Sequence, residues 1–212
     1  MFMKYLIVLI FVMTSLTGFG QKTFSEGEVH YNISVVSGNN EALAKAFSGA
    51  TQVVFVKGYQ ARVDFISQLR TQSTVYDAQS KSGFIMRQSG SEKYLIPLNP
   101  AQWLDFNKRY LSVNFTQTNE TKEILGYVAQ KATAKLGDGS ILEVWYVPAL
   151  PVLAKGYDLA FASLNGLPLE YTVSNGGLVL KYTATQVKNT MVNAAVMEMP
   201  KSGYKLLEYQ GS

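Results

Sequence analysis

The stretch that decides the fold is YVAQKATAKLGDGSILEVWYVP, residues 127–148. Apolar and polar residues alternate on both sides of Gly137-Asp138-Gly139, as they do in strands with one buried face. An Asp-Gly pair between two alternating segments is typical of a β-hairpin, because glycine accepts the positive φ angle of a tight turn. The stretch therefore predicts two antiparallel strands joined by a short turn.

The same pattern continues on both sides of this hairpin. Short alternating segments recur from residue 29 onward, and Gly, Ser, Asn and Asp separate them. A second hairpin is expected at Asn175-Gly176-Gly177, and segment 190–199 also alternates. Strands at this spacing predict a meander in an antiparallel sheet.

Three segments favour short helices instead of strands. Asn40 is placed to cap a helix over residues 41–47, and Asn99-Pro100 is a typical helix start that brings Trp103 and Phe106 onto one face. The third candidate is VLAKGYDLAFASL, residues 152–164, in which apolar residues recur at helical spacing. After it, NGLPLEY (165–171) is expected to form a helix-to-strand corner, with Gly166 in the left-handed conformation and Pro168 at the strand start.

The N-terminal segment and the composition bound the class of protein. Residues 1–20 combine Lys4, an apolar run and small residues, which is the layout of a secretory signal peptide. Residues 21–212 are then expected to be one domain, exported to the periplasm or cell envelope. The chain has a formal net charge of +4 and no cysteine. Its basic residues form no dense stripe, so nucleic acid is not an expected partner.

The residues that usually carry chemistry are sparse. His30 is the only histidine, and cysteine is absent, so we expect no catalytic triad and no metal site. No phosphate-binding glycine motif occurs, and no cofactor is expected. A hydrolase with a carboxylate pair remains a remote alternative, and its candidate residues are Asp64, Asp105, Glu143 and Glu170.

Aromatic residues are the most prominent feature, since Phe, Trp and Tyr make up 12% of the chain. Trp145 and Tyr146 are neighbours on one strand, so their rings face opposite sides. The aromatic helix face either packs on the sheet or covers a hydrophobic cavity. For such a cavity the candidate lining residues are Val63, Phe65, Trp103, Phe106, Val144, Tyr146 and Phe161.

The stretch 126–151, followed by NGLPLEY, resembles secreted Bacteroidota proteins of uncharacterised function. It is similar to the GLPGLI family, with Leu169 where that signature has its second glycine. More remotely the chain looks like the LolA/LolB-like lipoprotein carriers. This resemblance implies a mainly β fold, a strongly curved antiparallel sheet or unclosed barrel, with about three short helices over an apolar concave side. It also implies a Gram-negative source.

Together these features predict a non-catalytic, exported envelope protein that binds an acyl chain, lipid or lipoprotein between sheet and helices. The expected partner is a lipid or an acylated protein, with at most a peripheral membrane contact and a monomeric state. The alternative is a structural or protein-interaction module of the envelope, in which side chains fill the concavity.

Overall fold

The computed structural model describes residues 23–175 and 177–211, and the predicted signal peptide at 1–20 lies outside these residues. The described chain forms a single sheet in which neighbours follow the order β12-β6-β5-β4-β3-β2-β1-β11-β10-β9-β8-β7. The strands are β1 (Glu26–Gly38), β2 (Thr51–Lys57), β3 (Gln60–Ile66), β4 (Thr71–Asp77), β5 (Ser82–Ser89), β6 (Glu92–Leu98), β7 (Thr116–Ile124), β8 (Tyr127–Lys135), β9 (Ile141–Val147), β10 (Leu167–Asn175), β11 (Leu178–Lys188) and β12 (Lys205–Leu206).

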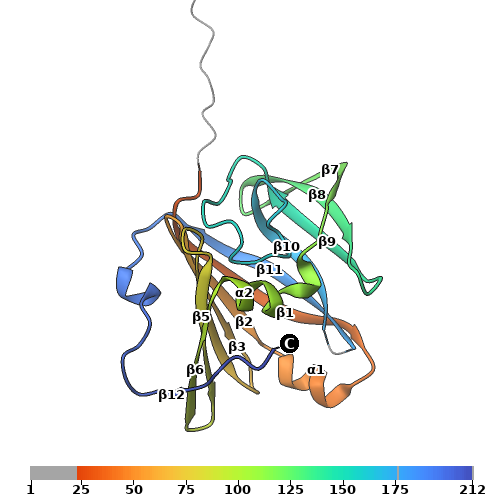
Figure 1. Ribbon diagram of the computed structural model, residues 1–212. Coiled ribbons are helices and arrows are strands. Elements are labelled where there is room, and N and C mark those ends of the chain that lie inside the picture. Colours follow the sequence, from red (N-terminus) through yellow and green to blue (C-terminus); the bar gives the residue numbers. More distant parts are fainter. Residues whose placement is uncertain (1–22, 176, 212) are drawn as a thin grey trace, which may run out of the picture.

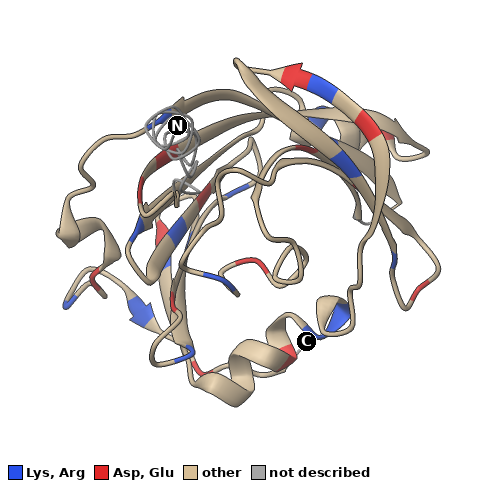
Figure 2. Ribbon diagram, turned by 90° about the horizontal axis from the view of Figure 1, so that it is seen from above, with Lys and Arg blue, Asp and Glu red and all other residues tan. Residues whose placement is uncertain are grey.

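The sheet curls strongly but does not close within the described residues (Figures 1 and 2). All pairs are antiparallel except β12 with β6, and β7 and β12 stand at the two ends of the order. The long strand β1 joins the halves, because it pairs with β2 on one side and β11 on the other. Two register shifts along its pairing with β11 increase the local bend. The predicted fold class is thus confirmed.

Two of the three predicted helices form, and both begin where the capping residues indicate. Asn40 accepts a hydrogen bond from the backbone of α1 (Glu41–Phe47), and Asn99 completes a capping box at the start of α2 (Pro100–Phe106). Two short 3-10 helices follow, η1 (Lys108–Tyr110) and η2 (Ala194–Met197). Among the described helices none combines the length and apolarity that a membrane crossing needs.

The prediction of a helix over 152–164 is wrong. This connection between β9 and β10 forms successive turns and runs inside the curve of the sheet (Figure 1). Gly156 has a φ of +96°, and its backbone approaches the Tyr76 ring closely. The Asp158 carboxylate accepts a hydrogen bond from the Ala160 backbone N–H, which replaces a helical bond with a local turn.

The alternating segment 190–199 is not a strand either. It contains η2 and packs on the outer face of β4, β5 and β6, where Val192 and Met197 join a buried cluster with Phe84 and Met86. The alternation of apolar residues therefore reflects contact with one face of the sheet, without pairing. The chain then continues to β12 at the edge of β6.

The corner at 165–171 forms where it was predicted, but glycine is needed at position 166 for a different reason. Pro168 lies at the start of β10, as expected. Gly166 does not adopt a left-handed conformation; a Cβ there would lie 2.5 Å from the Val147 carbonyl oxygen and 2.6 Å from the Tyr146 ring. Glycine is required at this position because the corner packs directly on β9.

Candidate ligand-binding site

Two adjoining cavities open on the concave face of the sheet, and we call them together the concave cleft. They share Gln52 and Tyr182 and have volumes of about 190 Å³ and about 250 Å³. Neither alone reaches the ~300–1,000 Å³ of small-molecule pockets, but together they enter that range. The first is lined by Phe47, Gln52, Val63, Phe65, Arg70, Gln72, Thr74 and Tyr182, and the second by Gln52, Arg109, Tyr110, Asp158, Ala160, Phe161, Tyr171, Val173 and Tyr182.

Stacked rings form the wall between the two cavities. Tyr171 of β10 and Tyr182 of β11 are register partners, so their side chains lie on one face. Their ring centroids are 4.6 Å apart with an interplanar angle of 10°. Phe161 meets Tyr171 edge-on at 4.7 Å. The β10–β11 hairpin therefore presents a rigid aromatic surface to the cleft.

Hydrogen bonds beneath this surface fix its position. Gln52 of β2 donates from Nε2 to the Tyr171 hydroxyl at 3.0 Å, and the Tyr31 hydroxyl donates to the Pro168 carbonyl at 2.7 Å. Burial raises the pKa of Tyr31 and of Tyr171 well above the ordinary value. Both phenols therefore stay neutral and act only as hydrogen-bonding groups.

Asp158 places a carboxylate in the cleft. It keeps partial solvent contact, accepts one hydrogen bond from the Ala160 N–H at 3.0 Å, and has no ion-pair partner among the described residues. Desolvation by the surrounding protein raises its pKa to about 6. Its charge also contributes to the raised pKa of Tyr182, for which burial is the main cause. At neutral pH the cleft thus contains an accessible, unneutralised acceptor beside aromatic rings.

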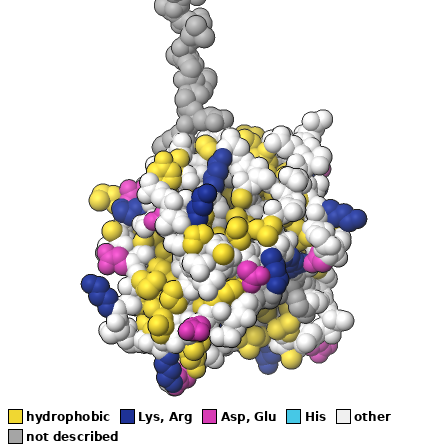
Figure 3. Space-filling model, in the orientation of Figure 1, with side chains coloured by type: hydrophobic (Ala, Val, Ile, Leu, Met, Phe, Trp, Pro, Cys, Tyr) yellow, Lys and Arg dark blue, Asp and Glu magenta, His cyan; other side chains and the backbone are white. Residues whose placement is uncertain are grey.

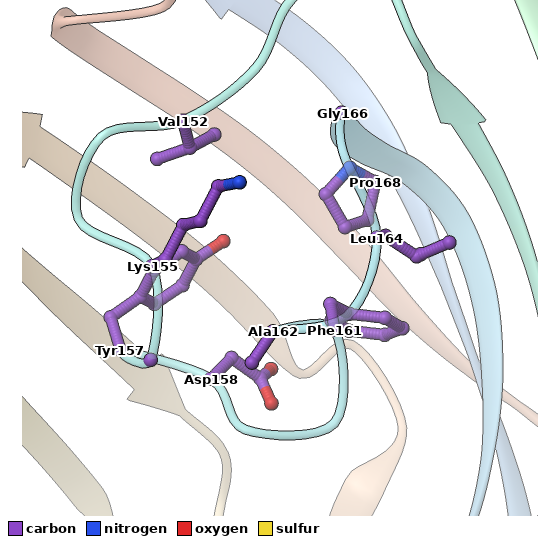
Figure 4. A pocket seen from close by; sticks show the side chains of 10 residues that line it. Val152, Lys155, Tyr157, Asp158, Phe161, Ala162, Leu164, Gly166 and Pro168 are labelled. Atoms are coloured by element: carbon purple, nitrogen blue, oxygen red, sulfur yellow. The ribbon is translucent and has the colours of Figure 1, made fainter. Parts of the chain in front are cut away.

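A third cavity lies within the β9–β10 connection itself (Figure 4). Val152, Lys155 and Tyr157 come from one limb of this loop, Leu164 from the other, and Pro168 from the start of β10. Its volume is only about 20 Å³, which is room for about one water molecule. This loop therefore fills part of the concavity and leaves the concave cleft open beside it.

The structure separates the seven predicted lining residues. Three of them line the concave cleft: Val63, Phe65 and Phe161. Phe106 lines another cavity, between β5, β6 and the C-terminal residues. The remaining three are buried in the core, namely Trp103, Val144 and Tyr146. Whether any of the seven contacts a ligand stays a prediction.

Trp103 is in the core because two contacts hold it there. Its ring stacks on Tyr76 at 4.4 Å, and its Nε1 donates to the Gly156 carbonyl at 3.1 Å. The predicted opposite orientation of Trp145 and Tyr146 is confirmed, since Tyr146 is buried and Trp145 faces the convex side with the Lys122 ammonium 4.2 Å from its ring centroid.

Each of the four acidic residues of the hydrolase alternative has a basic neighbour, and Glu143 and Glu170 share one face of the paired strands β9 and β10. The ion pairs are Asp64 with Arg62 (2.6 Å), Asp105 with Lys108 (3.6 Å), Glu143 with Lys131 (3.2 Å) and Glu170 with Lys122 (2.8 Å). Across residues 23–175 and 177–211, no three His, Asp or Glu side chains gather closely enough to hold a metal ion. His30 lies 2.8 Å from Glu28 on a partly exposed strand surface.

Sequence reasoning missed the polar members of the cleft, above all Asp158, Gln52, Tyr171 and Tyr182. One signal was available for the tyrosines. Counting outward from the expected turn at 175–177 pairs Tyr171 with Tyr182 on one face. No comparable signal existed for Asp158, because segment 152–164 was interpreted as a helix.

Fold and cleft place the chain among proteins built on an unclosed antiparallel β-barrel with an open concave face. More specifically, it belongs to the family described as N-glycanase peptide, N-terminal domain, whose model matches residues 53–210. This β-rich family assignment agrees with the predicted fold. The secreted Bacteroidota and lipoprotein-carrier resemblances are left as predictions.

Among solved structures, PNGF-II shares the fold at a TM-score of 0.51 and 17% identity. The match covers 87% of this chain and 31% of PNGF-II, so the chain spans about a third of that protein. An uncharacterised conserved protein from Thermus thermophilus matches at a TM-score of 0.48 and 12% identity, over 87% of this chain and 92% of that one. No curated protein matches the sequence.

Proposed function

We propose that this chain is a non-catalytic carbohydrate-binding module and that the concave cleft holds the saccharide. The observation that carries the proposal is the unpaired Asp158 carboxylate beside the stacked Tyr171 and Tyr182 rings. A sugar combines a C–H face that packs on an aromatic ring with hydroxyl groups that donate to a carboxylate. Ligand sites of this kind are aromatic surfaces with a few polar groups that set orientation.

The family adds independent support. Its description names an N-glycanase and a domain at that protein's N-terminus. A domain that accompanies a glycan-processing enzyme gains from holding the glycan. The carboxylates Asp64, Asp105, Glu143 and Glu170 are all engaged in ion pairs, which favours binding without catalysis.

Binding to a printed array of neutral, uronic-acid, sialylated and sulfated glycans tests the proposal. Removing the carboxylate in Asp158→Asn is expected to weaken binding about 10–100-fold, since a hydrogen bond to a charged group contributes ~1.5–3 kcal/mol and 1.4 kcal/mol is tenfold. Tyr182→Ala removes the platform and is expected to do the same. The matched controls are Glu123→Gln and Tyr59→Ala, both at exposed positions outside the cleft. An array with no bound glycan refutes the proposal.

An acyl chain or another apolar ligand is the second candidate. The observation that favours it is the group of apolar side chains Phe47, Val63 and Phe65 on one side of the first cavity. Titration with a fluorescent fatty acid separates the candidates. Saturable uptake that Phe65→Asp abolishes and Asp158→Asn leaves unchanged supports the apolar ligand. An envelope interaction module with a filled interior is the remaining alternative, and the packed β9–β10 connection favours it.

We also propose that the protein acts as a monomer exported to the periplasm or cell envelope of a Gram-negative bacterium. The motivation for the exported location is the signal-peptide layout of residues 1–20. Cell fractionation followed by N-terminal sequencing is expected to find a mature chain that starts at Gln21. Recovery of the full-length chain from the cytoplasm contradicts this.

A further inference from the structure

We propose that Arg70, with Arg87 held beside the cleft by Gln72, forms an anion-recognising end of the concave cleft, so that the preferred ligand is an acidic saccharide carrying a carboxylate or sulfate group. This inference rests on the proposed carbohydrate binding and narrows its ligand class.

Two of the four arginines form ion pairs and two do not. The chain has four, and Arg62 and Arg109 each form an ion pair, with Asp64 at 2.6 Å and Asp138 at 2.7 Å. Arg70 and Arg87 have no ion pair among the described residues. Guanidinium groups suit oxyanions such as carboxylate and sulfate, because their N–H donors form a fork that matches two oxygens. Two unneutralised guanidinium groups are therefore available on the concave face.

The sheet and its turns hold the two side chains close together. Gln72 pairs with Arg87 across β4 and β5, and its Oε1 accepts from the Arg87 Nε at 2.9 Å. Arg70 lies in the β3–β4 turn, where its carbonyl accepts the Ser67 N–H at 3.0 Å. Burial lowers the pKa of Arg87, and the neighbouring charge of Arg70 lowers it further. Like charges without a counter-ion are unfavourable, and an anion bound between them would relieve this repulsion.

The neighbouring groups define which anion fits. The cavity at Arg70 is also lined by Gln72, Thr74 and the Tyr182 ring, so it combines hydrogen-bonding groups with an aromatic surface. Asp158 lies in the adjoining cavity, on the other side of Tyr182. A ligand across both cavities would meet the Asp158 carboxylate in one, where Arg109 is already ion-paired with Asp138, and the Arg70 guanidinium group in the other. An acidic sugar, with hydroxyl groups toward Asp158 and its acid toward Arg70, matches this polarity.

Other charges near the site do not neutralise it. Glu208 lines the same cavity as Arg87, and no ion pair joins them. Viewed as in Figure 1, apolar side chains are interspersed with polar and charged ones (Figure 3). We expect selectivity for an anion to come from Arg70 and Arg87.

The test compares matched acidic and neutral glycans on the wild-type protein. The probes are sialylated N-glycans with their desialylated forms, and trigalacturonic acid with its methyl ester. We expect the acidic member of a pair to bind about 10–100-fold more tightly, with an affinity that falls as salt is raised. Arg70→Gln and Arg87→Gln should each remove this preference and leave the neutral partner's affinity within about twofold. Lys93→Gln, an exposed cation on β6, serves as the control and should keep the preference.

Each result bears on one claim. Glycan binding without a preference for the acid, or a preference that survives in Arg70→Gln and Arg87→Gln, overturns the anion inference and leaves the proposed function standing. Failure of every glycan to bind overturns the proposed function as well. If free sulfate alone binds, and Arg70→Gln abolishes this binding, the site is a simple anion site and the acidic-saccharide inference is wrong. Thermal unfolding of each variant confirms that a loss of preference comes from a folded protein.

Discussion

Replacing Asp158 by Asn is expected to stabilise the folded protein at neutral and alkaline pH. The folded-state pKa of Asp158 is about 6, above the ordinary 3.8, because burial disfavours the charged form. The folded protein therefore holds this proton more tightly than the unfolded chain. The stabilisation from this linkage is complete below pH 4 and is lost as the pH rises through 6. Asn has the same shape, stays neutral and can still accept from the Ala160 N–H.

The magnitude follows from the pKa difference. Raising a carboxyl pKa from 3.8 to about 6 costs the folded state about 3 kcal/mol once the group is ionised. Asp158 retains some solvent contact, so this figure is an upper value. Urea unfolding of wild type and Asp158→Asn measures it: Asn should be more stable by about 1–3 kcal/mol at pH 8, with the difference vanishing near pH 4.

Glu123→Gln is the matched control, because it removes an exposed carboxylate of β7. Its effect should stay within about 0.5 kcal/mol at both pH values. The reasoning is refuted if Asp158→Asn is less stable than wild type at pH 8. It is also refuted if the difference in free energy of unfolding between the two proteins is the same at pH 8 and pH 4. The carboxylate would then contribute to the fold through contacts that survive its ionisation.

Three further substitutions test the packing around the cleft. Trp103→Ala should cost about 3–5 kcal/mol in urea unfolding, because it removes a buried stacked ring, whereas Leu104→Ala on the exposed side of α2 should cost less than about 0.5 kcal/mol. Equal losses would mean that α2 is not anchored through its tryptophan. Tyr31→Phe should cost about 1–3 kcal/mol, because a buried carbonyl loses its donor; a neutral result would show that water replaces the hydroxyl. Gly166→Ala should lower the free energy of unfolding by about 1–3 kcal/mol, because the new Cβ overlaps the Val147 carbonyl. An unchanged thermal midpoint would show that the corner can move away from β9.

The parts of the fold that sequence predicted are those in which local chemistry and long-range packing agree. The 127–148 hairpin alternates on both strands and has its Asp-Gly turn, and β8 pairs with β9 in that register. Likewise Asn99 and Pro100 determine where α2 begins, since the cap needs only neighbouring atoms. β7 escaped prediction because its sequence, TQTNETKEI, is polar on both faces. As an edge strand with mostly exposed side chains, it has no buried face to produce an apolar alternation.

The cleft was harder to predict, because its charged groups lie on connections whose paths depend on the sheet. The loop 152–164 has a helical spacing of apolar residues, but it turns at Gly156 against Tyr76 of β4, a contact that no local pattern records. Its path decides where Asp158 points. Arg70 similarly owes its place to a turn between β3 and β4. Strand residues such as Phe65 could be assigned to the concave face from alternation alone.

The charges of the concave cleft share a property that argues for function. Most partly buried charges of this chain have partners, as Glu170 has in Lys122 and Lys181. Asp158 and the pair Arg70 and Arg87 have no ion-pair partner among the described residues, and the pKa of Asp158 shows that its charge destabilises the fold. Asp158 and Arg70 line the two cavities that share the Tyr182 ring, and Arg87 lies near Arg70 at the border of the cleft. A concave face that served only stability would gain from pairing Asp158 and Arg87, whereas a ligand with complementary polarity would neutralise the charges at both ends of the cleft at once.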